Sequence, residues 1–206
     1  MRRPDYLQQI ENRIHASPEN AVFITSDFLD LADTQAINKA LSRLTSNGTL
    51  RRVTWGVYDR PQFSELLQEY AAPDIDRIAK AIARNHGWTI VPSGDTALNM
   101  LGLSTQVPAV WQYVSDGPYR TYTIGNRELR FKHGANKDVS GLSGKFALVV
   151  QALKALGKNR IDDLILKELS ALLSPDEKRA FLADTQHRTA WINQVAKKLC
   201  AMEASQ

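Results

Sequence analysis

Residues 34–60 hold the densest cluster of side chains that could read a nucleic acid. Amide groups such as those of Gln35 and Asn38 can form paired hydrogen bonds with base edges, and lysine and arginine side chains can contact phosphate groups. Residues 35–60 carry five bases and one acid, whereas residues 5–33 carry one base and six acids. This local positive field indicates a polyanionic partner more clearly than the net charge of +4 does.

A helix is needed to present the first part of this cluster, and the sequence predicts one over residues 35 to about 46. Asp33 or Thr34 can cap its start, and Asn47-Gly48 supplies the left-handed residue that ends it. One face of this helix is apolar at three-to-four-residue spacing, which predicts that this face is buried. The apolar positions are Ile37, Ala40, Leu41 and Leu44.

Two strands, "TLRRV" and "VYDR", are predicted after this helix, joined by a turn at Trp55-Gly56. A helix from Asp5 to His15 and a short helix "DFLDLA", which Thr25 or Ser26 could cap, precede it. Helix, helix, tight turn, helix and hairpin is the order of a winged helix-turn-helix, whose last helix can enter a major groove. The DNA contacts that we predict on this helix and hairpin are Thr34, Gln35, Asn38, Lys39, Ser42, Arg43, Arg51, Arg52, Thr54, Trp55 and Arg60.

The fold class predicted for the whole chain is α+β. Residues 1–62 form the winged helix-turn-helix, 63–72 a connector that is partly helical, and 73–206 a mixed domain with an antiparallel sheet and a C-terminal helical bundle. In the mixed domain, we expect Ser93 or Asp95 to cap a helix and residues 109–133 to form a three-stranded antiparallel meander. The bundle helices are expected at about 144–156, 160–173, 175–186 and 188–203.

Patterns that could support catalysis fail in their spacing. "SGLSGK" at 140–145 resembles a phosphate-binding loop, but that loop needs four residues between its first glycine and Gly-Lys, then serine or threonine. Cys200 is the single cysteine, which excludes an internal disulfide and leaves too few thiols for a cysteine-based zinc site. We therefore expect no catalytic residue, no metal site and no cofactor, so the chain is predicted not to be an enzyme. No apolar window suits a signal peptide or a membrane span, so we expect a cytoplasmic protein without a membrane partner.

Three stretches carry a family resemblance: "SDFLDLADTQAINKALSRLTSNGTLRRVTWGVYDRP", "IAKAIARNHGWTIVPSGDTALNMLGLSTQVP" and "VSDGPYRTYTIGNRELRFKH". They resemble the AbiEi-type antitoxins, bacterial regulators of type IV toxin–antitoxin systems, over roughly residues 20–140. The resemblance implies a winged-helix repressor that binds double-stranded DNA at its own promoter. It also implies that the protein counters a cognate nucleotidyltransferase toxin without needing a stable complex with it. The chain could act as a monomer or a homodimer.

Two other readings of the residues stay open. The chain could be a non-enzymatic protein-interaction module, in which the winged helix docks one partner and the polar sheet face of residues 119–133 docks another. It could instead bind RNA through the basic region 144–206. For the DNA-binding reading, we expect replacement of Arg51 and Arg52 by alanine to abolish DNA retention and to leave the melting transition nearly unchanged.

Overall fold

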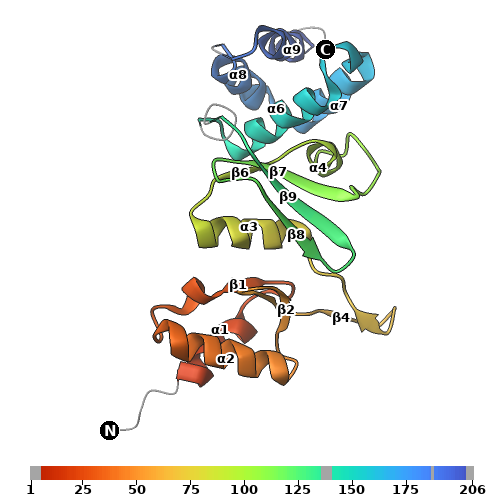
Figure 1. Cartoon of the computed structure of the whole chain (residues 1–206). Coiled ribbons are helices and arrows are strands. Elements are labelled where there is room, and N and C mark those ends of the chain that lie inside the picture. Colours follow the sequence, from red (N-terminus) through yellow and green to blue (C-terminus); the bar gives the residue numbers. More distant parts are fainter. Residues whose placement is uncertain (1–5, 136–140, 187, 203–206) are drawn as a thin grey trace. The chain divides into compact units, whose positions relative to one another are not determined.

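The structure is a computed structural model that describes residues 6–135, 141–186 and 188–202. Helices and several small sheets alternate along the chain (Figure 1), which confirms the α+β class. The chain divides into two compact units: Met1–Trp88 with Thr121–Leu129, and Thr89–Arg120 with Arg130–Gln206. The predicted domain division at residues 62 and 73 differs from these units and stays a prediction.

The first unit begins with the elements predicted for the N-terminal region. Its strands β1, β3 and β2 form an antiparallel sheet in that order, and β4 pairs with β5. The elements are α1 (Tyr6–Ala16), β1 (Val22–Ile24), the 3-10 helix η1 (Thr25–Phe28), α2 (Thr34–Ser46), β2 (Arg51–Thr54), β3 (Val57–Asp59), β4 (Phe63–Ser64), β5 (Glu69–Tyr70) and α3 (Ile75–His86).

Helix α2 forms as predicted. The Asp33 side chain accepts a hydrogen bond from the backbone N–H of Ala36 at 2.8 Å, which caps the start of the helix. The helix ends at Asn47 and Gly48, whose φ of +82° favours glycine. The predicted apolar stripe is buried together with side chains from α1, β1 and η1. Members of this core include Ile10, Ile14, Phe23, Phe28, Ile37, Leu41, Leu44, Leu50 and Tyr58.

Two local predictions for the first unit are wrong. The short helix "DFLDLA" is a single 3-10 turn, η1, and neither Thr25 nor Ser26 caps it. The carboxylate of Asp27 instead accepts from the backbone N–H of Ile24 at 2.9 Å. Residues 63–72 hold no helix, because the segment turns back on itself as the β4–β5 ribbon.

Helix α3 buries an apolar face that includes Ile75, Ile78 and Ile82, and it lies against β1. Asp74 caps its start by accepting from the backbone N–H of Arg77 at 3.1 Å. Gly87, with a φ of +67°, ends it.

Strands β6 (Ile90–Pro92), β7 (Val110–Ser115), β8 (Arg120–Ile124) and β9 (Arg127–His133) form a sheet in the order β6-β7-β9-β8. The meander prediction is therefore wrong, because β9 lies between β7 and β8. Gly94, at a φ of +60°, precedes α4 (Asp95–Met100), and no side chain caps this helix. The expected cap Ser93 is buried and accepts from the side chain of Gln112 instead.

The C-terminal helices surround one apolar core built around Phe146, Leu153, Leu169 and Phe181. Ser174 and Glu177 form the capping box that starts α8. Of the last expected helix, 188–203, residue 203 lies outside the described residues. The elements are α6 (Gly144–Leu156), the 3-10 helix η2 (Lys158–Arg160), α7 (Asp163–Leu172), α8 (Pro175–Asp184) and α9 (Ala190–Ala201). Within the described ranges, every helix is too short or too polar to cross a membrane.

Candidate nucleic-acid interface

Helix α2 presents a polar face to solvent because its other face is buried. Its 13 residues span about 20 Å at the rise of an α-helix. The face carries amide, hydroxyl, ammonium and guanidinium groups and no carboxylate after the capping residue Asp33. Of the predicted contacts, the exposed residues on this helix are Thr34, Gln35, Asn38, Lys39, Ser42 and Arg43.

The tip of the β2–β3 hairpin presents an arginine held by two aromatic rings. Gly56, with a φ of +73°, forms the turn, and the Trp55 side chain beside it is 87% exposed. The guanidinium carbon of Arg52 lies 5.2 Å from the ring centroid of Trp55 and 5.4 Å from that of Tyr58. One guanidinium nitrogen of Arg52 also donates to the Tyr58 hydroxyl at 2.9 Å. Arg52 is exposed, so its charge is both oriented and accessible.

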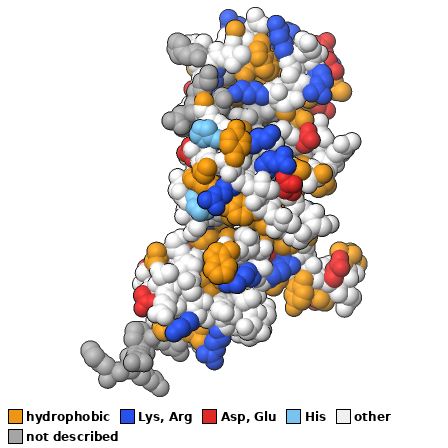
Figure 2. Space-filling view, in the orientation of Figure 1, with side chains coloured by type: hydrophobic (Ala, Val, Ile, Leu, Met, Phe, Trp, Pro, Cys, Tyr) orange, Lys and Arg blue, Asp and Glu red, His pale blue; other side chains and the backbone are white. Residues whose placement is uncertain are grey.

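The helix and the hairpin share one surface hollow of about 210 Å³. Asn38 contributes to it from α2, and its side-chain carbonyl accepts from the Thr25 hydroxyl at 2.8 Å. Figure 2 shows Lys and Arg side chains on this part of the surface. The residues that line the hollow are Thr25, Asn38, Arg52, Trp55, Gly56 and Tyr58.

Arg51 is built into the fold instead. Its guanidinium binds both carboxylate oxygens of Asp59, at 3.0 and 2.5 Å, and donates to the backbone carbonyl of Ala71 at 3.1 Å. Asp59 is buried, so this pair compensates a carboxylate that water does not reach. The expectation that the chain melts normally without Arg51 therefore conflicts with the structure.

Arg60 also has structural partners, since its guanidinium donates to the backbone carbonyls of His15 and Ser17 at 3.2 and 2.7 Å. These bonds join the end of the hairpin to the end of α1. We do not retain Arg51 or Arg60 as DNA contacts. Thr54 is half-buried in β2 and pairs with Val57 next to the turn.

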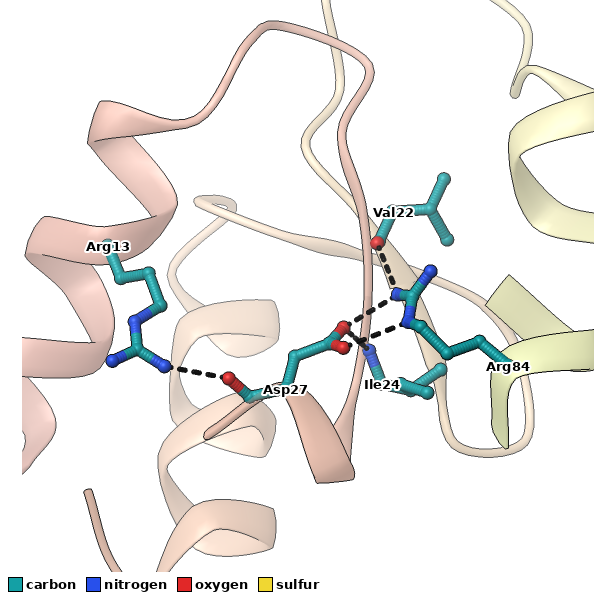
Figure 3. A network of polar contacts seen from close by, with 5 residues as sticks. All are labelled: Arg13, Val22, Ile24, Asp27 and Arg84. Carbon is teal, nitrogen blue, oxygen red and sulfur yellow. Dashed lines mark hydrogen bonds and ion pairs between the residues drawn. The ribbon is translucent and has the colours of Figure 1, made fainter. Parts of the chain in front are cut away.

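Two arginines bind Asp27 and Asp30, which precede α2, and Figure 3 shows the contacts of Arg13 and Arg84 with Asp27. Arg84, on α3, binds both carboxylate oxygens of Asp27 at 3.0 and 2.8 Å. Arg13, on α1, donates to the backbone carbonyl of Asp27 at 2.7 Å and binds the Asp30 carboxylate at 2.8 and 2.6 Å. Hydrogen bonding from Arg13 lowers the pKa of the Asp30 carboxyl below its ordinary value. The network holds η1 in place and reduces the repulsion that an anion approaching α2 would meet.

Sequence reasoning missed Thr25 and Tyr58 as parts of the hollow and Arg13 and Arg84 as the partners of the acids. Tyr58 could have been found only from the hairpin register, in which it lies opposite Arg52. The two arginines act across large separations along the chain, for which the sequence carries no local signal. Among residues 6–135, 141–186 and 188–202, no group of three or more His, Cys, Asp and Glu side chains could hold a metal ion.

The chain was compared with sequence models of protein families and with curated proteins. Residues 9–181 match the sequence model of DUF6088, a family of unknown function. A search of curated proteins gives no match.

Proposed function

The chain belongs to the DUF6088 family, and we propose that it is a DNA-binding transcriptional regulator of the winged helix-turn-helix type. The element order α1, β1, η1, α2, β2, β3 and the sheet order β1-β3-β2 support this assignment. Helix α2 serves as the groove-reading helix, and the β2–β3 hairpin serves as the wing. A helix of this diameter fits the major groove, which is about 12 Å wide.

The observation that carries the proposal is the shared hollow. It brings an amide of the groove-reading helix, Asn38, onto the same surface as the wing residues Arg52 and Trp55. A duplex seated on α2 would therefore meet an oriented cation and an exposed aromatic ring at its flank. The amide donates to and accepts from a base edge, and Arg52 contacts the phosphate backbone.

The test begins with selection of a preferred duplex from a random pool, followed by anisotropy titrations at several salt concentrations. Asn38→Ala should lose about 1–3 kcal/mol of discrimination between the preferred and altered duplexes. Arg52→Ala should weaken binding to all duplexes and reduce the slope of log K against log salt by about 0.9. Arg179→Ala is the matched control. Arg179 is an exposed arginine on α8, where it pairs with Asp176 of the same helix.

Failure to bind any duplex at low salt would exclude the proposal. Equal salt slopes for the wild type and Arg52→Ala would show that Arg52 of the β2–β3 hairpin does not contact the phosphate backbone. Capture of tRNA in preference to duplex DNA would favour the RNA-binding alternative.

We further propose that the regulator acts in the cytoplasm as the antitoxin of a type IV system, repressing its own operon. The support is the resemblance of residues 20–140 to AbiEi-type antitoxins. The test is co-expression with the product of the adjacent gene. If that product is a nucleotidyltransferase whose toxicity this chain relieves, the antitoxin role stands. If the adjacent gene product is of another kind, or if its toxicity persists, the antitoxin role is excluded and only the proposal of a transcriptional regulator remains.

A further inference from the structure

The β4–β5 ribbon, residues 63–70, forms an exposed apolar arm on the first unit. Leu66 and Leu67 at its tip are 93% and 65% exposed, and Phe63 and Tyr70 are about half exposed or more. The rings of Phe63 and Tyr70 meet edge to face at 5.3 Å. Figure 1 shows β4 standing away from α1, α2 and strands β1 to β3. A two-stranded ribbon is at best marginally stable in water, so this arm needs a partner that covers it.

The arm is nevertheless held in a defined conformation. At its tip, Gln68 has a φ of +54°, and its side chain donates to the backbone carbonyl of Glu65 at 2.6 Å. At its root, the backbone N–H of Ala71 donates to the Gln62 carbonyl at 2.8 Å, and Arg51 donates to the Ala71 carbonyl. A preorganised apolar segment loses little entropy on docking, so it is suited to binding.

The charge of the arm selects its partner. Its charged residues are two acids, Glu65 and Glu69, and both are exposed. Two arms from two copies would bring like charges together, which disfavours arm-to-arm pairing. An apolar groove with basic rims would suit the arm instead.

The second unit carries such a groove, beside η2 and α9. Its volume is about 90 Å³. Of its lining side chains, Ile161, Trp191 and Val195 are half-buried or buried, and the two lysines are exposed. Asp162, next in sequence, is engaged in capping α7 through the backbone N–H of Ile165. The full set of lining residues, called here the α9 groove, is Lys158, Ile161, Trp191, Gln194, Val195 and Lys198.

We propose that the occupant of the α9 groove is the β4–β5 arm of a second copy of this chain. A leucine of the arm tip enters the groove, and Glu65 and Glu69 meet Lys158 and Lys198. One arm in one groove is a single small contact. Reciprocal exchange of two arms makes two such contacts, so the symmetric dimer is the favoured assembly. This inference does not depend on DNA binding.

The test is sedimentation velocity of the full chain over a concentration series. The proposal predicts a concentration-dependent dimer, with a dissociation constant below about 100 μM. Leu66→Asp with Leu67→Asp should weaken dimerisation by about 100-fold or more. Val107→Asp is the matched control, because Val107 is an exposed apolar residue in another loop, and this variant should dimerise as the wild type does.

Charge reversal identifies the groove. The pair Glu65→Lys with Glu69→Lys, and the pair Lys158→Glu with Lys198→Glu, should each weaken dimerisation about tenfold or more. Their combination in one chain should restore it. Mixing the Leu66→Asp, Leu67→Asp variant with the Lys158→Glu, Lys198→Glu variant should form a heterodimer through one intact arm and one intact groove.

A wild type that stays monomeric at about 100 μM would overturn the proposal. Dimerisation that is unchanged by Leu66→Asp with Leu67→Asp would also overturn it. So would dimerisation that is weakened by the arm-tip substitutions but unchanged by Lys158→Glu with Lys198→Glu. Duplex binding by each monomeric variant, measured in parallel, separates failure of this proposal from failure of the regulator.

Discussion

The two ends of the β2–β3 hairpin use adjacent arginines differently. At the base, Arg51 compensates Asp59, whose side chain is 2% exposed. At the tip, Arg52 lies between Trp55 and Tyr58 and faces solvent. Both residues are part of one basic cluster in the sequence, yet burial of the partner assigns one to stability and leaves the other free for recognition. The cost of removing an arginine should therefore depend on whether a carboxylate is left behind and on how deeply that carboxylate is buried.

The largest effect is expected at the base of the hairpin. Arg51→Ala should lower the free energy of unfolding by about 2–4 kcal/mol, because Asp59 would remain buried without a counter-charge. Urea denaturation followed by circular dichroism measures this change. Adding Asp59→Ala to the same chain should recover part of the loss. A midpoint equal to that of the wild type for Arg51→Ala would show that Asp59 is not held as the structure has it.

A smaller effect is expected between α3 and η1. Arg84→Ala should lower the free energy of unfolding by about 0.5–1 kcal/mol. The reason is that Asp27 is more exposed than Asp59 and keeps its hydrogen bond from the Ile24 N–H. The same denaturation series measures it, with Lys80→Ala as a surface ion-pair control. A loss as large as that of Arg51→Ala would break the relation between exposure and cost.

At the tip, Arg52→Ala should change the free energy of unfolding by about 0.5 kcal/mol, because Arg52 is exposed and its removal leaves no buried charge without a partner. The same variant should weaken duplex binding. Arg52→Ala should therefore reduce the affinity for DNA much more than the stability, whereas Arg51→Ala should reduce the stability. Thermal melting and anisotropy titration on one protein sample make the comparison. Parallel losses in both measurements would assign Arg52 to the fold.

The smallest effect is expected at Asp30, whose side chain is 61% exposed. Arg13 lowers the pKa of this carboxyl, so the pair stabilises the folded chain above the ordinary carboxyl pKa. That contribution is lost as the pH falls from about 4 through the lowered pKa. Asp30→Asn should therefore differ slightly from the wild type in urea midpoint at pH 7 and match it in strong acid. A difference that grows on acidification would contradict this assignment.

Local patterns predicted most elements of the fold. The cap Asp33 and the periodic apolar face of α2 form as predicted, because each depends on residues within a few positions of one another. The errors at η1, at residues 63–72 and at the start of α4 are local. The position of β9 between β7 and β8 is a long-range choice that no local spacing encodes.

Helical periodicity was enough to predict that α2 buries one face and leaves amide and basic side chains on the other. The turn at Trp55-Gly56 was also predicted from the residue types. Which arginine is exposed depends on the strand pairing. A regular two-residue hairpin would place Arg52 opposite Asp59, but a register shift between Arg52 and Thr54 places Arg51 there and pairs Arg52 with Tyr58. One extra residue in β2 shifts every pair farther from the turn by one position. Burial of the partner, and not the residue type, therefore separates the structural role of Arg51 from the exposed position of Arg52.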